Sequence, residues 1–276
     1  LTNKIMALCH FSSFYEAMDA AQYLVQLDPV TVELIDDKMI SLARSIPLFH
    51  TTVSDFVSGD PAALLVVEFA EETDTANITK IRELKKRMAK LNAQSKKSRY
   101  SDAACVVTLE PTADQNRISE MRKSGLNIMM SMKSETKPVS FVEDCAVPLE
   151  YLAQYTQGLT RIFEKYDTSG TWYAHASVGC LHVRPLLNMK LGEDAEKMRS
   201  IATEAFALVK AYGGSHSGEH GDGISRSEFN PIMFGKNLTN AFRELKRILD
   251  PDGLFNPGKI IDAPEMNARD LFRFAP

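Results

Sequence analysis

An apolar run, AALLVVEFA at Ala62–Ala70, constrains the fold of this chain more than any other feature. The run is rich in valine and leucine and follows the turn residues Gly59-Asp60-Pro61, so it predicts a buried strand. A long amphipathic helix is predicted directly after it, from about Asp74 to Leu91. The apolar residues of that helix lie three or four apart: Ile78, Ile81, Leu84, Met88 and Leu91. The chain therefore has to build a sheet with helices packed on it.

Similar strand and helix signals recur along the rest of the chain. Strands are predicted at Lys4–Phe11, Thr31–Ile35, Ala103–Leu109 and Phe141–Val147, and Trp172–Leu187 is expected to be mostly extended. Helices are predicted at Ser13–Gln26, Asp36–Ser45, Thr112–Ser124, Pro148–Tyr166, Glu193–Tyr212 and Asn237–Leu249. We expect a loop at Phe49–Asp60, a strand or buried extended segment at Leu126–Met132, and irregular backbone at Asp250–Lys259.

The order of these elements indicates the fold class. Strands often follow one another closely, and neither GxGxxG nor GxxxxGK[ST] occurs. We therefore predict an α+β fold with a largely antiparallel sheet and helices on one face, in which two βαβ-like units adopt a ferredoxin-like arrangement. No linker divides the 276 residues, so we expect one domain over residues 1–276, with residues 250–276 as an irregular tail.

Composition narrows the classes of function. A net charge of −4 and a pI near 5.9 give no basic surface for nucleic acid. The local basic run Lys80–Lys97 has apolar residues at helical spacing, which favours a solvated helix face. No apolar run approaches the ~18 residues of a membrane span, and no signal peptide is visible. Four widely spaced cysteines suit a reducing compartment, so we expect a cytoplasmic location.

Two short blocks hold most of the residues with chemical potential. YAHASVGCLHVR at Tyr173–Arg184 and GGSHSGEHGDGISR at Gly213–Arg226 contain four of the six histidines, together with Glu219 and six glycines. Glycine adds no side-chain packing but lets the backbone approach a ligand. The two blocks indicate a metal or proton-transfer site; the alternative is a pair of polar turns with buried, hydrogen-bonded histidines.

His175 and His182 are seven residues apart, which would place them on opposite faces of one regular strand. A tight turn or bulge at Ser177-Val178-Gly179 would return both to one side. Two imidazoles and the carboxylate of Glu219 would then form a common zinc or manganese set with positions open to water or substrate. Cys180 is either a soft ligand or, as we favour, a core residue.

The residues around these ligands suggest roles in substrate binding. His220 follows Glu219 directly, and adjacent side chains diverge in extended backbone, so it could face substrate and accept a proton near neutral pH. Arg184 shares strand parity with His182 and can pair with a carboxylate. Arg122 and Arg226 are further candidates for binding a substrate carboxylate. For either residue taken alone, an ordinary surface arginine is the default interpretation.

HASVGCLH, GEHGDG and DPDGLFNPGK, in this order, resemble the C-terminal domain of FAD-linked oxidases. That family belongs to the superfamily of vanillyl-alcohol oxidase and of D-lactate, glycolate and D-2-hydroxyglutarate dehydrogenases. TVELID, GDPAALLVVEFA and FVEDCAVP also look like blocks of the family, so the resemblance spans nearly the whole chain. The segment AHASVGCLHVRP looks closest to a bacterial branch of the family in which the flavoenzyme is fused to a C-terminal iron–sulfur module.

The resemblance implies a role for each candidate residue. His175, His182 and Glu219 would hold a divalent metal, zinc or manganese, and His220 would take the hydroxyl proton of a small 2-hydroxy acid while hydride passes to FAD. Arg122 would hold substrate, and Asn256 would lie on the cofactor side. The family's dehydrogenases usually have a lysine in a KYD-type block and an asparagine two residues after the second histidine. Here Val142-Glu143-Asp144 and Arg184 stand instead, and Arg184 would favour a second carboxylate or a bulkier anion.

The family's FAD-binding domain and the iron–sulfur module do not match any part of these residues, and the sequence starts at Leu1 rather than methionine. We therefore expect a fragment that by itself neither binds FAD tightly nor turns over substrate. A non-catalytic metal-binding or assembly domain is the alternative function, and a docking module, using residues 256–259 and 271–276, is compatible with either. Through the parent protein, the resemblance allows peripheral membrane or electron-acceptor contacts and a homo-oligomer.

Overall fold

The computed structural model describes residues 3–95, 99–100 and 105–273 and divides into two compact units. Unit 1 comprises Leu1–Ser134, Leu149–Gln157 and Thr171–Leu181, and unit 2 comprises Glu135–Pro148, Gly158–Gly170 and His182–Pro276. The division passes through helix α7 (Leu152–Lys165) and close to the start of strand β8 (Cys180–Leu187).

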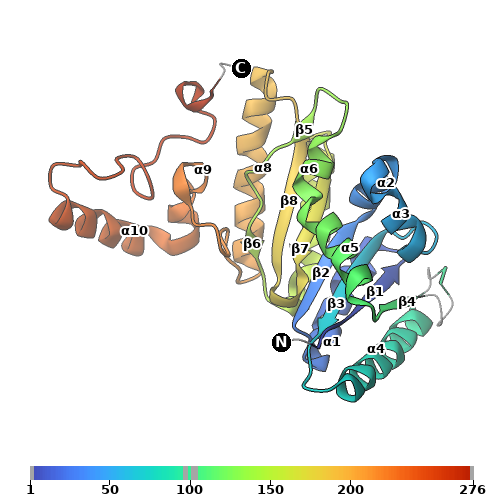
Figure 1. Cartoon of the computed structure of the whole chain (residues 1–276). Helices are drawn as coiled ribbons and strands as arrows, with labels where there is room; N and C mark the ends of the chain where they lie inside the picture. The colour runs from blue at the N-terminus through green and yellow to red at the C-terminus, as the bar shows by residue number, and fades with distance from the viewer. Residues whose placement is uncertain (1–2, 96–98, 101–104, 274–276) are drawn as a thin grey trace. The chain divides into compact units, whose positions relative to one another are not determined.

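Unit 1 is built on an antiparallel sheet with the strand order β4-β1-β3-β2-β7 (Figure 1). Its strands are β1 (Ile5–Phe11), β2 (Thr31–Asp36), β3 (Ala63–Phe69), β4 (Val106–Leu109) and β7 (Gly170–His175). β3 is the apolar run that the sequence singles out, and it pairs with β1 on one side and β2 on the other. The order β4-β1-β3-β2, with all neighbours antiparallel, is that of a ferredoxin-like βαββαβ sheet. The predicted fold class is confirmed.

Helices cover both faces of this sheet. The two crossover helices, α1 (Phe14–Leu24) and α4 (Asp74–Gln94), pack on one face, as predicted. The opposite face carries α2 (Asp37–Ser45), α3 (Pro47–Phe56), α5 (Thr112–Lys123) and α6 (Gly125–Met130), whose apolar residues form one core with Met6, Leu8, Leu64 and Val66. β1 is consequently buried along its whole length. The sequence pattern predicts α2 and α5 as helices but not α3 or α6, and its expectation of helices on one face alone does not include this second layer.

Asp36 ties two elements of unit 1 together. Its Oδ1 accepts a hydrogen bond from the backbone N–H of Met39 at 2.8 Å, which caps the N-terminus of α2. Its Oδ2 accepts one from the backbone N–H of Trp172 at 2.8 Å, in β7. Burial raises the pKa of Asp36 to about 7, although both hydrogen bonds favour the charged form.

Three local predictions are wrong. Phe49–Asp60 is not a loop over most of its length, because α3 runs from Pro47 to Phe56 and buries Phe49, Thr52 and Val53 on one side. Leu126–Met132 is neither a strand nor extended, since α6 spans Gly125–Met130. The strand predicted at Phe141–Val147 shrinks to β6 (Cys145–Ala146). Of the strand predicted at Ala103–Leu109, residues 103–104 lie outside the described residues.

Unit 2 packs helices against a small sheet. β8 pairs with β5 (Lys137–Pro138) and with β6, and Ala146 of β6 also bridges Ser215. The long helix α8 (Gly192–Ala211) buries Ile201, Phe206 and Val209. α9 (Gly223–Ser227) and α10 (Asn230–Leu249) follow, and α10 is kinked at Gly235. Helices α8 and α10 confirm the predicted ones, although α10 starts seven residues before the predicted Asn237.

The predicted irregular tail begins after α10. Residues 250–273 contain turns and one 3-10 turn, η4 (Arg269–Leu271), and hydrogen bonds hold the tail to the rest of unit 2. Among these, Asn230 Nδ2 donates to the carbonyl of Ile260 at 3.1 Å, and the backbone N–H of Met266 donates to Glu228 at 2.8 Å. Within the described residues, no helix combines the length and apolar character needed to cross a membrane.

Candidate functional site

A turn separates the two histidines of the first block. β7 ends at His175, a 3-10 turn covers Ala176–Val178, and Gly179 adopts φ 68° before β8 begins at Cys180. A positive φ is readily available to glycine and disfavoured for other residues. The turn predicted between the histidines is therefore confirmed, and the histidines lie on consecutive strands rather than on one.

In unit 1, His175 lies against a carboxylate that the sequence analysis does not single out. Glu33 of β2 and His175 of β7 are cross-strand partners, so their side chains lie next to each other on the sheet. His175 Nδ1 is 3.0 Å from each carboxylate oxygen of Glu33. This contact leaves Nε2 as the ring nitrogen that can coordinate a metal.

Arg122, from the last turn of α5, completes this group in unit 1. Its Nη2 donates to Glu33 Oε2 at 2.5 Å and lies 3.4 Å from His175 Nδ1. Glu33 is buried, and a buried carboxylate needs a charged or hydrogen-bonding partner. The guanidinium of Arg122 is such a partner. Two predicted site residues, His175 and Arg122, are thus brought together through Glu33.

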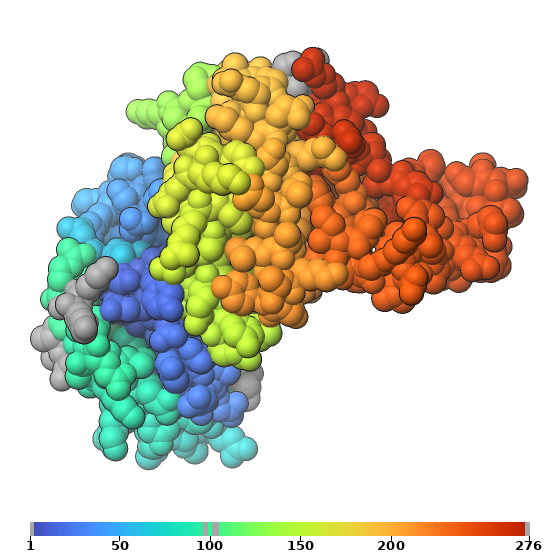
Figure 2. Space-filling model, turned by 180° about the vertical axis from the view of Figure 1, so that it is seen from behind, coloured from blue at the N-terminus to red at the C-terminus, as the bar shows by residue number. Residues whose placement is uncertain are grey.

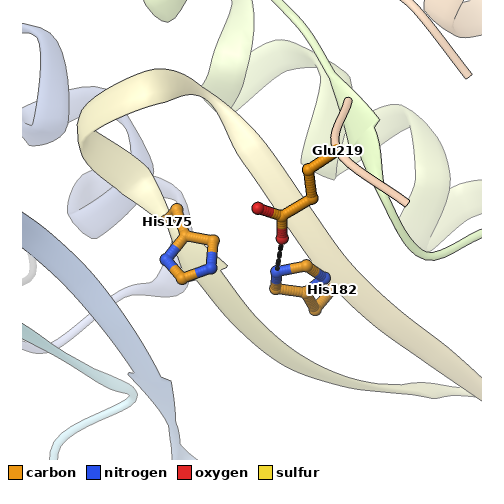
Figure 3. Close-up of side chains that lie close together, drawn as sticks. All are labelled: His175, His182 and Glu219. Carbon is orange, nitrogen blue, oxygen red and sulfur yellow. Dashed lines mark ion pairs between the residues drawn. The ribbon is translucent and has the colours of Figure 1, made fainter. Parts of the chain in front are cut away.

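In unit 2, the second histidine meets the predicted acid. His182 Nε2 lies 3.1 Å from Glu219 Oε1, the contact drawn as a dashed line in Figure 3. The His182 side chain is only 3% exposed, whereas that of Glu219 is 46% exposed. An imidazole nitrogen and a carboxylate oxygen at this separation are donors that a divalent metal can take, and the carboxylate is open to solvent.

His220 stacks beside this pair. Its ring lies 5.3 Å from that of His182, with 24° between the planes, and its Nε2 is 3.5 Å from Glu219 Oε1. The other ring nitrogen, Nδ1, lies 3.9 Å from a carboxylate oxygen of Glu143 and 3.9 Å from one of Asp144. The ring therefore has carboxylates on both sides and is 44% exposed, as a proton acceptor for a bound ligand must be.

Arg184 forms a buried ion pair with Glu143. Its Nη2 lies 2.6 Å from Glu143 Oε2, with side-chain exposures of 8% and 10%. Arg184 and His182 both lie on β8, two residues apart, in line with the predicted parity. The pair places an arginine near His220 but balances its charge with a carboxylate.

Asp144 lies under the turn that carries Glu219 and His220. Burial alone would raise its pKa. The backbone N–H of His220, the hydroxyl of Ser217 and the backbone N–H of Glu219 outweigh that effect, so the pKa of Asp144 falls below its usual range. A carboxylate is therefore held here as an anion.

The remaining candidates have other surroundings. His216 is fully buried, with Nε2 3.2 Å from Asn230 Oδ1, and burial lowers its pKa; it is a hydrogen-bonded core histidine. Arg226 is buried and donates to the carbonyls of Gly221 and Glu143 at 2.7 and 3.1 Å, so it braces the loop. Cys180 is buried, and Asn256 is exposed in the tail with φ 45°.

The sequence analysis misses Glu33 and the bonding role of Asp144. Glu33 is one of two acidic residues in TVELID and lies between the apolar residues Val32 and Leu34, and an acid inside a buried strand is a signal for a polar partner. Asp144 had no comparable signal, because its partners lie more than seventy residues away in sequence.

Comparisons with known proteins show where the chain belongs. A family model described as FAD linked oxidases, C-terminal domain, matches residues 2–260. The D-2-hydroxyglutarate dehydrogenase of Escherichia coli (strain K12) is 31% identical over 264 residues, which cover 93% of this chain and 25% of the relative. Glycolate oxidase subunit GlcD of Bacillus subtilis (strain 168) is 26% identical over 254 residues, 90% of this chain and 50% of the subunit. The chain thus spans a quarter to a half of the length of these relatives.

Solved structures share the fold. The 4-ethylphenol oxidase from Gulosibacter chungangensis, in its isoeugenol complex, matches with a TM-score of 0.64 at 11% identity, over 96% of this chain and 55% of that one. p-Cresol methylhydroxylase with substrate bound gives 0.64 at 12% identity, over 94% and 53%. At such identities the likeness concerns the fold alone. Together with the family match over nearly the whole chain, it confirms the resemblance: the chain belongs to the family of FAD-linked oxidase C-terminal domains.

Proposed function

We propose that this chain is the substrate- and metal-binding domain of an FAD-dependent dehydrogenase that oxidises a D-2-hydroxy acid to the 2-oxo acid. His175, His182 and Glu219 are the proposed ligands of a divalent metal, zinc or manganese. His220 is the proposed proton acceptor, and Arg122 and Arg184 are the proposed substrate-binding cations. The proposed substrates are of the 2-hydroxyglutarate, lactate or glycolate type, in keeping with the names of the relatives.

The observation that carries the proposal is the group His182, Glu219 and His220 in unit 2. One ring nitrogen of His182 faces the carboxylate of Glu219 at 3.1 Å, and the neighbouring ring of His220 is exposed and stacked on His182. In unit 1, the contact of Glu33 with Nδ1 of His175 directs Nε2 toward a ligand role. Imidazole and carboxylate donors with an exposed carboxylate fit a catalytic divalent cation better than a closed structural site.

The residues of the chain account for the chemistry of the substrate hydroxyl. When bound, the metal supplies a Lewis acid and FAD supplies a two-electron acceptor. His220 Nε2 accepts the hydroxyl proton, and the hydride leaves the α-carbon as the carbonyl forms. The carboxylates of Glu143 and Asp144 beside Nδ1 stabilise the imidazolium that results.

Two arginines suit an anionic substrate. Arg122 has one guanidinium nitrogen on Glu33, and its planar fork has further N–H groups for a substrate carboxylate. Arg184 is already paired with Glu143, so it would meet a second substrate carboxylate only if Glu143 shared it. The pair therefore favours substrates whose second anionic or polar group is accepted by both residues.

FAD would be held mainly by a separate domain, which we propose docks on α10 and the tail. Large apolar side chains are exposed there: Leu238, Leu245, Ile248, Leu249, Leu254, Phe255 and Ile260. Figure 2 shows this segment of unit 2 in orange to red. Asn256 lies in the same surface and is the proposed cofactor contact. An apolar surface of this kind is typical of an interface.

The rest of the proposal concerns the parent protein. An iron–sulfur module, contact with an electron acceptor or a peripheral membrane surface, and a homo-oligomer are proposed for the parent alone. A cytoplasmic location is proposed because all four cysteines are free and buried.

Turnover by the full-length flavoprotein tests the function. D-2-hydroxyglutarate, D-lactate and glycolate are supplied separately, with and without a chelator, to the wild type and to variants. We expect turnover of at least one acid, its loss with chelator, and a decrease of about 10²–10⁴-fold with His220→Ala. His50→Ala is the matched control, since His50 is exposed on α3 and its ring contacts the carbonyl oxygen of Arg44 rather than a proposed site residue.

Metal analysis of the same proteins, alongside their turnover, tests the alternative function. A non-catalytic metal-binding or assembly domain would lose metal in Glu219→Ala while turnover stayed at the wild-type level. Full turnover by His220→Ala would contradict the proposed proton transfer.

A further inference from the structure

Asp144 makes an unusual number of hydrogen bonds to one short turn. Its Oδ1 accepts from the backbone N–H of Glu219 at 2.9 Å, and its Oδ2 accepts from the backbone N–H of His220 at 2.9 Å and from Ser217 Oγ at 2.8 Å. Its carbonyl accepts from the backbone N–H of Gly218 at 2.6 Å. Every residue from Ser217 to His220 therefore donates to Asp144.

The position of Asp144 is itself fixed. The side chain has no exposed area, and the residue directly precedes β6, which pairs with β8 and with Ser215. Its backbone adopts φ 78°, a conformation that is unfavourable for most L-residues and that, apart from glycine, aspartate and asparagine tolerate best. The turn from Ser217 to His220 is thus bonded to a buried residue at the start of a paired strand.

The functional side chains of the turn point away from this anchor. Glu219 and His220 give their backbone N–H groups to Asp144, while the Glu219 carboxylate lies on His182 and the His220 ring stacks on His182. A displacement of the turn would therefore move the Glu219 carboxylate relative to His182 Nε2. The orientation of both side chains depends on the same two backbone bonds.

We propose that Asp144 is a positioning residue that fixes the backbone of Ser217–His220, so that Glu219 is presented to a metal and His220 to substrate. The inference rests on the proposed function for the identity of the metal ligands. It adds a residue that touches neither metal nor substrate and acts through backbone N–H groups. Partners in this outer position commonly change metal affinity about 10–100-fold when replaced.

Asp144→Asn is the informative substitution. Asparagine keeps the size of the side chain and tolerates the positive φ, but its NH₂ group replaces one acceptor oxygen and would face an N–H or O–H donor. Ser217→Ala removes only one hydroxyl donor and leaves both backbone bonds in place.

Asp250→Asn is the matched control in the same unit. Asp250 is also buried and accepts from two backbone N–H groups, those of Leu254 and Phe255, both at 2.9 Å. It also pairs with Lys246, and the loop it organises is the tail after α10. A general loss of stability from replacing a buried, bonded aspartate will appear in this variant too.

Zinc and manganese titrations of the 276-residue chain, with the unfolding midpoint and the hydrogen exchange of the Glu219 and His220 amides, test the inference. We expect Asp144→Asn to bind both metals about 10–100-fold more weakly and to exchange both amides faster without added metal. Asp250→Asn should retain wild-type affinity at a similar unfolding midpoint, and Ser217→Ala should lie between it and Asp144→Asn.

Two results would overturn the inference: wild-type affinity in Asp144→Asn, or an equal decrease in affinity for Asp250→Asn. If the wild type binds neither metal, the proposed function fails, and the amide exchange alone decides the inference. Unchanged protection of Glu219 and His220 in Asp144→Asn would then refute it.

Discussion

At the scale of single residues, Asp36 makes folding depend on pH. Its pKa is raised to about 7 by burial in the folded chain, against about 3.9 in an unfolded one. Between these values the folded state binds the extra proton, so the free energy of unfolding falls as pH rises, by about 1.4 kcal/mol per pH unit from this group.

Asp36→Asn should remove that dependence. We expect denaturant unfolding at pH 4.5, 5.5 and 6.5 to show the wild type losing stability with pH relative to the variant. The variant will be less stable at pH 4.5, since asparagine cannot accept from both Met39 and Trp172. Curves that run parallel across this range would show that Asp36 does not titrate there.

Replacing either of two adjacent glycines, Gly213 or Gly214, with alanine should lower the free energy of unfolding by different amounts. A Cβ on Gly214 would lie 2.2 Å from the carbonyl oxygen of Ala146, because Gly214 directly precedes Ser215, the bridge partner of Ala146. Gly213 has open space around it but adopts φ 71°. We expect Gly213→Ala to cost about 1–2 kcal/mol and Gly214→Ala more than about 3 kcal/mol, measured by denaturant unfolding. Equal costs would contradict the close approach at Gly214.

The sequence pattern predicts some of the site residues and not others. His175, His182, Glu219 and His220 stand in glycine-rich blocks, where a polar residue has no packing reason to occur. Glu33 and Asp144 lie in segments that resemble ordinary strands. Strand register places His175 beside Glu33, and a loop distant in sequence brings Glu219 to Asp144. Such partners depend on tertiary structure, which periodicity does not contain.

At the scale of elements, the strongly periodic segments were predictable and the short ones were not. β3 and α4 match their predictions because a long apolar run and repeated helical spacing are each hard to satisfy otherwise. α6 has six residues, GLNIMM, and an apolar run of that length fits a strand equally well. A Cβ on its Gly125 would lie 3.1 Å from the end of the Met39 side chain, which would have to shift slightly to accept it.

The exposed apolar side of α10 predicts an interface rather than a core. Ile248 and Leu249 are 66% and 72% exposed, so replacing both with serine should change the free energy of unfolding by less than about 0.5 kcal/mol. The same double variant should weaken binding to a separately produced FAD-binding domain, measured by titration. Lys236→Ser, exposed on the same helix, is the control. Undiminished binding would remove α10 from the proposed docking surface.

At the scale of the whole molecule, the fold class followed from the order of elements and the absence of nucleotide-binding motifs. The strand order β4-β1-β3-β2 agrees with the predicted ferredoxin-like arrangement. The second layer of helices in unit 1 was not predictable in the same way, because α3 and α6 lack a long periodic signal.

Metal stoichiometry of the purified chain tests the central claim most directly. The account predicts that the wild type and His50→Ala each bind one zinc or manganese ion per chain. His175→Ala, His182→Ala and Glu219→Ala should lose that ion while keeping the wild-type circular dichroism spectrum. Binding that survives all three substitutions, or a folded wild type that takes up no ion from an excess of either metal, would contradict it.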